Sequence, residues 1–182
     1  MTKKANQFKY LIQDLKRWKA DKPSQFFYFC FDLGVWATIL YRIRRALFLI
    51  NIPIVRVFLR LIGFSLHKFS EVFLGVCISS CTDIGPGLYI GHTGAIRIHP
   101  DAKAGKNLNI GSTVTIGVLG DGHNAGVPII GDNVFIHTGA VVLGGIRIGN
   151  NVRIGANAVV LSDIPDNATA VGVPAKVVKI RA

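Results

Sequence analysis

Residues 78 to 160 repeat with a period of six, and this repeat constrains the fold more than any other feature of the chain. Aliphatic residues, with one alanine among them, recur at every sixth position in three runs: Ile78, Ile84 and Ile90; Ile98, Ala104, Ile110 and Ile116; Ile130, Ile136, Val142, Ile148, Ile154 and Val160. A second apolar residue often follows four positions later, as at Leu88, Leu108, Val114, Val134, Ile146 and Val152. A six-residue repeat is typical of a parallel β-helix, in which each repeat forms a short strand and a corner. A single coil cannot bury its own apolar face, so stacked coils share one core.

The repeat is interrupted twice, and both interruptions lie near histidines. The first is a two-residue shift of the frame at 96–98, just after His92. The second is the glycine-rich segment 117–127, which contains His123, and the C-terminal segment 163–182 then leaves the period. Loops that leave a rigid scaffold commonly carry function. We therefore expect the functional site near these interruptions.

Positive charge is concentrated in the first part of the 182-residue chain, which has a net charge of +11. Residues 1–70 carry 13 Lys and Arg against three Asp, whereas residues 71–182 carry eight against seven acidic residues. The basic residues are interleaved with Phe, Leu, Ile and Trp and form no known nucleic-acid-binding motif. The pattern favours an anionic membrane surface over nucleic acid as partner. A helical cap on the end of the β-helix, with solvated basic residues, is the alternative, and both can hold.

Residues 1–72 are expected to form amphipathic helices. Apolar residues three and four positions apart predict a helix from Asn6 to Lys19, and the apolar segment from Phe26 to Phe69 predicts two or three more. Its basic residues would extend from the apolar surface toward anionic headgroups. They are Arg42, Arg44, Arg45, Arg56, Arg60 and Lys68. The charge-free apolar runs are about ten residues long, and spanning needs roughly twenty, so no transmembrane helix is expected.

The cysteines point to the compartment. Cys30, Cys77 and Cys81 are an odd, sparse set without the spacing of a zinc site or of a secreted disulfide framework. No signal peptide pattern precedes the first apolar stretch. We therefore expect a cytoplasmic protein, peripheral at the inner face of the cytoplasmic membrane.

Two segments of the repeat carry a resemblance to a known family: DIGPGLYIGHTGAIRIHPDAKAGKNLNIGSTVTIG, and a later one ending in IGANAVVLSDIPDNATAVGVPAKV. Over about 76–180 the chain resembles hexapeptide-repeat acyltransferases, in the branch of serine O-acetyltransferases and their relatives in surface-polysaccharide biosynthesis. The resemblance implies a left-handed parallel β-helix over 73–182, an exception to right-handed crossovers. It also implies a homotrimer with active sites between subunits and acetyl-CoA as donor. No metal is expected, because the histidine cluster of a zinc-dependent carbonic anhydrase is not recognisable.

His92, in the segment IGHTG, looks like the catalytic histidine of this family. An acceptor hydroxyl has a pKa far above 7 and needs a base, and imidazole, with an unperturbed pKa of about 6.5, suits that task. We expect direct attack on the thioester without an acyl-enzyme, with backbone N–H groups stabilising the oxyanion. In serine acetyltransferases an earlier aspartate orients this histidine, and that position here holds Cys77. Asp83 is a weaker candidate for the role; Asp101, a backbone carbonyl or another subunit are the alternatives.

The resemblance also assigns positions to coenzyme A. The pantetheine arm would lie against small residues and backbone amides at Gly139, Ala140, Ala156 and Ala158, with Lys176 near the nucleotide phosphates and Lys179 and Arg181 as helpers. These small residues also suit tight corners, and the two interpretations can coexist.

The other histidines receive weaker assignments. From its loop, His123 would enter the site of a neighbouring subunit. His99 would line the cleft, and His137 is either structural or near the pantetheine arm.

The acceptor positions depart from the serine acetyltransferase pattern. Those enzymes carry Asp directly before the catalytic histidine and an Arg-His pair before the coil that corresponds to 128–134; here Gly91 and Gly126–Val127 stand at these places. The charges that would hold serine are missing. A sugar hydroxyl of a capsular or other surface polysaccharide, or of its lipid-linked precursor, is therefore the predicted acceptor. Serine is the alternative, and a trimeric scaffold without activity, suggested by Cys77, is the third.

Overall fold

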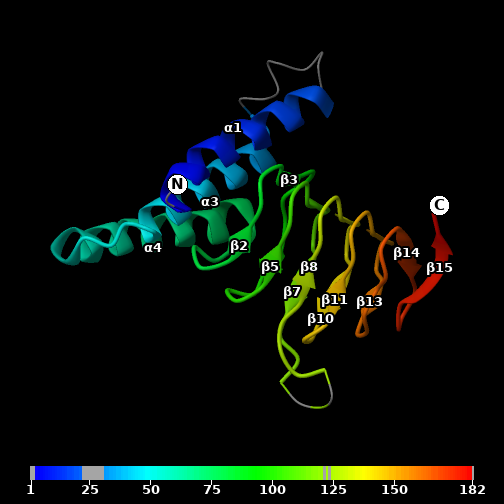
Figure 1. Cartoon of the computed structure of the whole chain (residues 1–182). Coiled ribbons are helices and arrows are strands. Elements are labelled where there is room, and N and C mark those ends of the chain that lie inside the picture. The colour runs from blue at the N-terminus through cyan, green and yellow to red at the C-terminus, as the bar shows by residue number, and fades with distance from the viewer. Residues whose placement is uncertain (1–2, 22–30, 121, 123, 182) are drawn as a thin grey trace.

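The computed structural model describes residues 3–21, 31–120, 122 and 124–181. Three helices in this part of the chain, α1 (Lys3–Asp21), α3 (Leu33–Phe48) and α4 (Pro53–Leu74), lie at one end of a column of short strands (Figure 1). The helices predicted for the N-terminal segment are therefore confirmed, and the last of them runs two residues past the expected boundary at 72. Among the described helices, none combines the length and apolar character that crossing a membrane requires.

Local sequence explains where these helices begin and end. The Asp32 carboxylate accepts hydrogen bonds from the backbone N–H groups of Gly34 and Val35, a cap that stabilises a helix by about 0.5–2 kcal/mol. Pro53 stands at the first turn of α4, where its missing N–H costs nothing. Gly75 ends α4 with a φ of 65°, which a residue with a Cβ rarely adopts. The chain then turns directly into the first strand.

The strands form three sheets in which every third strand pairs. The first sheet contains β1 (Val76–Ile78), β4 (Ile96–Ile98), β7 (Thr115–Gly117), β10 (Val141–Leu143) and β13 (Val159–Val160). The second contains β2 (Asp83–Ile84), β5 (Lys103–Ala104), β8 (Ile129–Ile130) and β11 (Arg147–Ile148). The third contains β3 (Tyr89–Ile90), β6 (Asn109–Ile110), β9 (Phe135–Ile136), β12 (Arg153–Ile154), β14 (Ala168–Val171) and, antiparallel to β14, β15 (Lys176–Ile180). The predicted parallel β-helix is confirmed.

The six-residue series fills the core. Ile78, Ile98, Ile116, Val142 and Val160 are stacked partners in the first sheet, and the other two sheets stack the rest of the series in the same way. Apart from the partly buried Ala104, these side chains are no more than 5% exposed. Burying one such side chain stabilises the fold by about 1.5–3 kcal/mol. The predicted column of aliphatic residues is thus the core itself.

Asparagines form a ladder along one corner of the β-helix. Asn107, Asn133, Asn151 and Asn167 have φ values of 57–61°, in the left-handed region that asparagine tolerates better than most residues. Each side-chain amide donates to the next asparagine down the stack, at 2.8, 3.0 and 2.8 Å. The same residue type thus satisfies both the backbone turn and the polar contact between coils.

Helices close the open end of the first coil. The carbonyls of that coil have no preceding coil to donate to them, so other donors are needed. Three side chains of α3 donate to them: Arg42 to Ile84 and Gly85 (2.8 and 2.6 Å), Arg44 to Ile78 (2.9 Å), and Arg45 to Ser80 and Cys81 (3.0 and 2.8 Å). These arginines are 1–5% exposed. The expectation that they extend toward lipid headgroups is therefore wrong, because the end of the β-helix takes up their hydrogen bonds.

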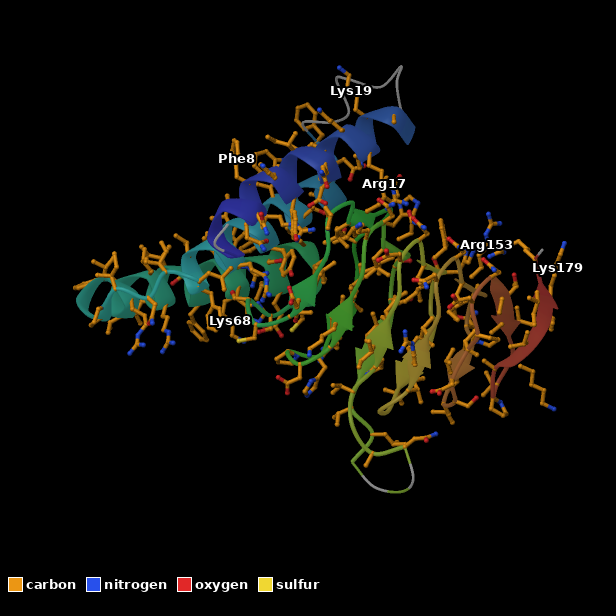
Figure 2. The ribbon with its side chains drawn as sticks, viewed as in Figure 1. Phe8, Arg17, Lys19, Lys68, Arg153 and Lys179 are labelled. Carbon is orange, nitrogen blue, oxygen red and sulfur yellow. The ribbon has the colours of Figure 1, made fainter. Side chains whose placement is uncertain are left out.

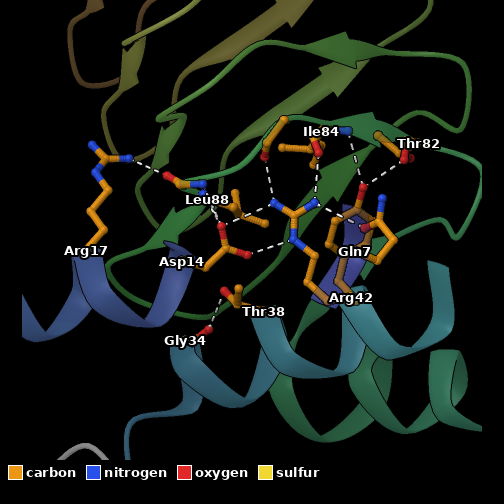
Figure 3. A network of polar contacts seen from close by, with 12 residues as sticks. Gln7, Asp14, Arg17, Gly34, Thr38, Arg42, Thr82, Ile84 and Leu88 are labelled. Atoms are coloured by element: carbon orange, nitrogen blue, oxygen red, sulfur yellow. Dashed lines mark hydrogen bonds and ion pairs between the residues drawn. The ribbon is translucent and has the colours of Figure 1, made fainter. Parts of the chain in front are cut away.

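A buried ion pair joins this cap to α1 (Figure 3). Arg42 Nε donates to Asp14 at 2.7 Å, and both side chains are 1% exposed. The other oxygen of Asp14 accepts from the backbone N–H groups of Gly87 and Leu88 at 2.6 and 2.8 Å. Burial raises the pKa of Asp14 above its ordinary value, while Arg42 and the two N–H groups oppose that rise. One carboxylate thereby ties α1, α3 and the first coil together.

The described residues of the segment 117–127, which are all except 121 and 123, leave the β-helix between β7 and β8 and project from it (Figure 1). Leu119 and Gly126 form an antiparallel bridge at its base. Asn124 accepts from the backbone N–H of Gly145 at 2.8 Å and donates to the carbonyl of Leu161 at 2.7 Å. The loop is therefore attached to the neighbouring coils.

Candidate active site

His92 stands on an enlarged corner of the β-helix. Stacked partners in β1 and β4, such as Ile78 and Ile98, are twenty residues apart, whereas those in β4 and β7 are eighteen apart. The two additional residues lie in the corner after β3, where Gly94 and Ala95 have φ values of 119° and 47°. The side chain of His92 is exposed there. The two-residue frame shift in the sequence thus corresponds to the enlarged corner on which the His92 imidazole is exposed.

The imidazole lines a groove of about 350 Å³ that crosses three coils. The groove is lined by residues in and just after β3, β6 and β9: Tyr89, Gly91, His92, Asn109, Ile110, Gly111, Phe135, His137 and Thr138. Gly111 lets two coils pack closely along the groove, because a Cβ there would lie 2.5 Å from the backbone nitrogen of Thr138 in the next coil. Coils are spaced by roughly 4.8 Å, so His92 and His137 mark two levels of the groove about 10 Å apart.

The described part of the chain offers the His92 ring no hydrogen-bond partner. Asp83, the weaker sequence candidate for that role, lies on β2 in the second sheet, whereas the groove follows the third. Its carboxylate pairs with Arg45 at 2.6 Å. The structure therefore does not bring Asp83 and His92 together within one chain.

Cys77 faces α4, where His67 and Glu71 are its neighbours. Its sulfur lies 3.8 Å from Nε2 of His67, and the Nδ1 of that ring lies 2.5 Å from a nitrogen of Arg44. An arginine can only donate, so Nδ1 accepts and the proton of the neutral ring is on Nε2, toward Cys77. Burial, followed by Arg44, lowers the pKa of His67, which favours that neutral ring.

This tautomer decides against a metal at the same place. His67, Glu71 and Cys77 form the one group of possible ligands found in the described residues, with ligand atoms within 4.8 Å of one another. A protonated Nε2 has no lone pair for a metal, and ligand histidines normally donate from the other nitrogen rather than accept there. Burial also raises the pKa of the Cys77 thiol, so it disfavours the thiolate that a metal needs.

The positions predicted for coenzyme A separate into two groups. Ala156 and Lys176 are exposed, and Gly139 is half-buried at a corner with a φ of 73°. Ala140 and Ala158 are fully buried, and their backbone N–H and C=O groups are engaged within the β-helix. The prediction that these two alanines line a cofactor surface is corrected, because they are part of the core.

The two other histidines that the sequence assigns to the site do not join this groove in the described structure. His99 lies at the corner between β4 and β5, where its Nδ1 accepts from the backbone N–H of Asp101 at 3.2 Å. That corner does not belong to the groove of His92. His123 lies outside the residues that the structure describes.

Sequence reasoning did not find three of the residues that line the groove, Tyr89, Asn109 and Phe135. Each directly precedes a core residue of the third sheet, so its side chain alternates outward. The ring of Phe135 also lies 4.4 Å from that of His137. Once the six-residue frame is known, the position before each core residue of β3, β6 and β9 is the signal that identifies this surface.

An exposed imidazole beside an open, partly aromatic groove is suited to taking a proton from a bound hydroxyl group. Comparison with known proteins places this geometry in a family. The family model described as bacterial transferase hexapeptide (six repeats) matches residues 128–162. The serine acetyltransferase of Neisseria gonorrhoeae is 34% identical, with a TM-score of 0.82 over 98% of this chain and 67% of that one. The chain belongs to the bacterial hexapeptide-repeat transferase family.

Two further relatives are serine acetyltransferases. A serine acetyltransferase of Staphylococcus aureus strain Mu50 is 41% identical over 115 residues, which are 63% of this chain and 54% of that relative. The chain thus spans about half the length of that relative. A serine acetyltransferase solved in complex with CoA is 26% identical, with a TM-score of 0.80 over 96% of this chain and 70% of that one. These relatives support the serine acetyltransferase branch of the resemblance and not its surface-polysaccharide branch.

Proposed function

We propose that the protein is an acetyl-CoA-dependent O-acetyltransferase in which His92 is the general base. The observation that carries this proposal is the exposed imidazole on the enlarged corner, at the first level of a groove that crosses three coils. The similarity to a serine acetyltransferase solved with CoA supports the choice of donor.

The reaction needs one proton acceptor and no covalent enzyme intermediate. The acceptor hydroxyl gives its proton to His92 while its oxygen bonds to the carbonyl carbon of the thioester. The resulting tetrahedral oxyanion collapses, the carbon–sulfur bond breaks, and the departing CoA sulfur takes the proton from the imidazolium. Positioned proton transfer of this kind contributes about 10²- to 10⁴-fold in rate. Cys77 is not suited to act as nucleophile, because burial raises the pKa of its thiol.

We propose a homotrimer with sites between neighbouring subunits. The loop 117–127 leaves the corner between β7 and β8, whereas His92 occupies the corner between β3 and β4 (Figure 1). In one chain these two corners are separate edges of the β-helix. The loop would therefore complete the groove of a neighbour rather than its own, and His123 would enter the site in this way. A partner for the His92 ring would come from that neighbour or from the substrates.

The acceptor that the comparisons favour is serine. The relatives reported above are serine acetyltransferases, so serine O-acetylation takes precedence over the sugar hydroxyl expected from the sequence. The sugar remains the second candidate because of a specific observation: the residue beside His92 in the groove is Gly91, which offers no charge to an ammonium group. The aromatic rings of Tyr89 and Phe135 on the same surface would suit a sugar face.

Release of free thiol from acetyl-CoA separates the two acceptors. With serine and acetyl-CoA we expect turnover that rises with serine concentration and forms O-acetylserine, identified by mass spectrometry. Alanine, which lacks the hydroxyl, is the matched control and should give only background. Turnover with neutral sugars but not with serine would move the assignment to the sugar. No thiol release with either class would favour the inactive scaffold.

We further propose a cytoplasmic location with peripheral contact to an anionic membrane. The sparse cysteines and the +10 charge of residues 1–70 support this proposal. The buried arginines of α3 cannot reach lipid headgroups, so the contact would have to be made by other basic residues of the N-terminal segment.

A further inference from the structure

The half of α4 that faces away from the protein is almost entirely apolar. Nine of its side chains are 42–72% exposed: Val55, Val57, Phe58, Leu61, Ile62, Phe64, Phe69, Val72 and Phe73. At 3.6 residues per turn they cover about half of the helix circumference. The opposite stripe, which includes Leu59, Gly63 and Ser70, is half-buried or buried toward the rest of the protein. Only Ser65 and Lys68 interrupt the apolar half.

The α3–α4 hairpin carries this surface beyond the β-helix. Its far end projects sideways from the first coils (Figures 1 and 2), whereas its C-terminal end contacts β1 through Ser70 and His67. Monomeric proteins rarely leave so continuous an apolar area in water, so another surface covers it. The described part of the chain provides no such cover.

Basic groups border the apolar half. Arg60 lies 5.9 Å from the ring of Phe48, and the amine of Lys68 lies 5.9 Å from the ring of Phe64. The two charged groups therefore lie over aromatic rings at the edge of the apolar half, and both residues are exposed. Arg56 adds a third cation, and Glu71, bound to Lys68 at 2.8 Å, is the acidic residue of the helix.

We infer that the apolar half of α4 inserts into the headgroup region of an anionic membrane. The charge pattern selects the occupant. Lys68 is already paired with Glu71, so the net positive charge of the border is that of Arg56 and Arg60; a second copy of α4 would bring these like charges together, whereas anionic lipid neutralises them. The helix lies in the plane of the bilayer and does not cross it. This inference rests on the proposed membrane contact and not on the proposed reaction.

Flotation of the full-length protein with vesicles tests the assignment. We expect the protein to float with vesicles of phosphatidylcholine and phosphatidylglycerol, and far less with phosphatidylcholine alone. The double substitution Phe58→Ser and Leu61→Ser should lower the bound fraction about tenfold or more, because it removes two of the most exposed apolar side chains. High salt should also weaken binding.

A matched pair on α1 provides the control. Phe8 and Ile12 are 70% and 39% exposed one helical turn apart, and Phe8 lies on the opposite side of the cap from Lys68 (Figure 2). Phe8→Ser with Ile12→Ser should leave flotation unchanged. Equal loss in both double variants, undiminished flotation of the α4 variant, or no flotation of the unsubstituted protein would overturn the inference.

Two further measurements separate the alternatives. Light scattering without lipid should give the same mass for the unsubstituted protein and both variants; a smaller mass for the α4 variant would show that a second copy covers this face. Acetyl transfer to a water-soluble acceptor, measured without vesicles, should be the same for all three. For the unsubstituted protein, turnover without flotation would therefore contradict only the membrane assignment, and flotation without turnover would contradict only the reaction.

Discussion

Replacing His92 with alanine is expected to lower kcat for acetyl transfer by about 10²- to 10⁴-fold, the range that a positioned base contributes. The imidazole is exposed and has no hydrogen-bond partner in the described chain, so its loss should not disturb folding. The measurement is the initial rate of thiol release at saturating acetyl-CoA, with oligomeric mass and thermal stability recorded alongside. Unchanged mass and stability would assign the loss to chemistry.

His99 provides the matched control for this prediction. It is also a corner histidine, but it caps the backbone of Asp101 and lies outside the groove of His92. His99→Ala should keep kcat within about twofold of the unsubstituted protein. If His92→Ala retained full turnover, or if His99→Ala lost as much, the assignment of the base would be wrong.

Replacing Asp14 with asparagine is expected to destabilise the protein by about 3–5 kcal/mol. The substitution keeps the shape of the side chain but leaves the Arg42 guanidinium, 1% exposed, without its counter-charge. Removing one partner of a buried ion pair has costs of this size. For a chain of this length, about 2–4 °C in Tm corresponds to each kcal/mol, so we expect Tm to fall by roughly 10 °C.

The comparison must be made at one protomer concentration, because assembly contributes to stability. Glu71→Gln is the control, since it breaks an ion pair with Lys68 on the surface of α4, and its Tm should match that of the unsubstituted protein. A Tm for Asp14→Asn within a degree of the unsubstituted value would mean that the cap does not depend on this pair. If the uncompensated charge of Arg42 causes the loss of stability in Asp14→Asn, the double variant Asp14→Asn with Arg42→Met should have a higher Tm than Asp14→Asn alone.

The β-helix could be predicted because its core residues recur at a short, regular spacing in the sequence. Ile84, Ile90 and their counterparts stack because the period of six returns each to the same edge, and no long-range information is needed. The frame shift at 96–98 likewise identified the enlarged corner of His92. The same pattern contained an unused signal. Ala140 and Ala158 follow Ile136 and Ile154 by four residues, the offset of the buried second series, so their burial was predictable.

The cap could not be predicted in the same way. Arg42, Arg44 and Arg45 among apolar residues have the composition of a membrane-surface helix. Their actual partners are backbone carbonyls of the first coil, which sequence patterns do not display. Burial lowers the pKa of Arg44 to about 10, so the side chain still carries its charge at neutral pH. Only knowing which element covers the end of the β-helix distinguishes these arginines from Arg60 on α4.

The site was predictable only in part for a related reason. His92 is recognisable from its motif, but the groove beside it combines residues from three coils that are far apart in sequence, such as Tyr89 and Phe135. The replacement of the expected acid by Cys77 is visible in the sequence. The sequence does not show that the thiol of Cys77 faces His67, a residue of α4. What a corner residue contacts depends on neighbouring elements that no repeat period encodes.

A crystal structure of the protein with coenzyme A bound tests the central assignment most directly. The account predicts that the CoA thiol sulfur lies within about 4 Å of the His92 imidazole, the separation at which attack and proton transfer are geometrically possible. It also predicts that the pantetheine arm follows the groove past Gly111 toward His137. Coenzyme A with its sulfur on another face of the β-helix, out of reach of His92 in every subunit, would contradict it.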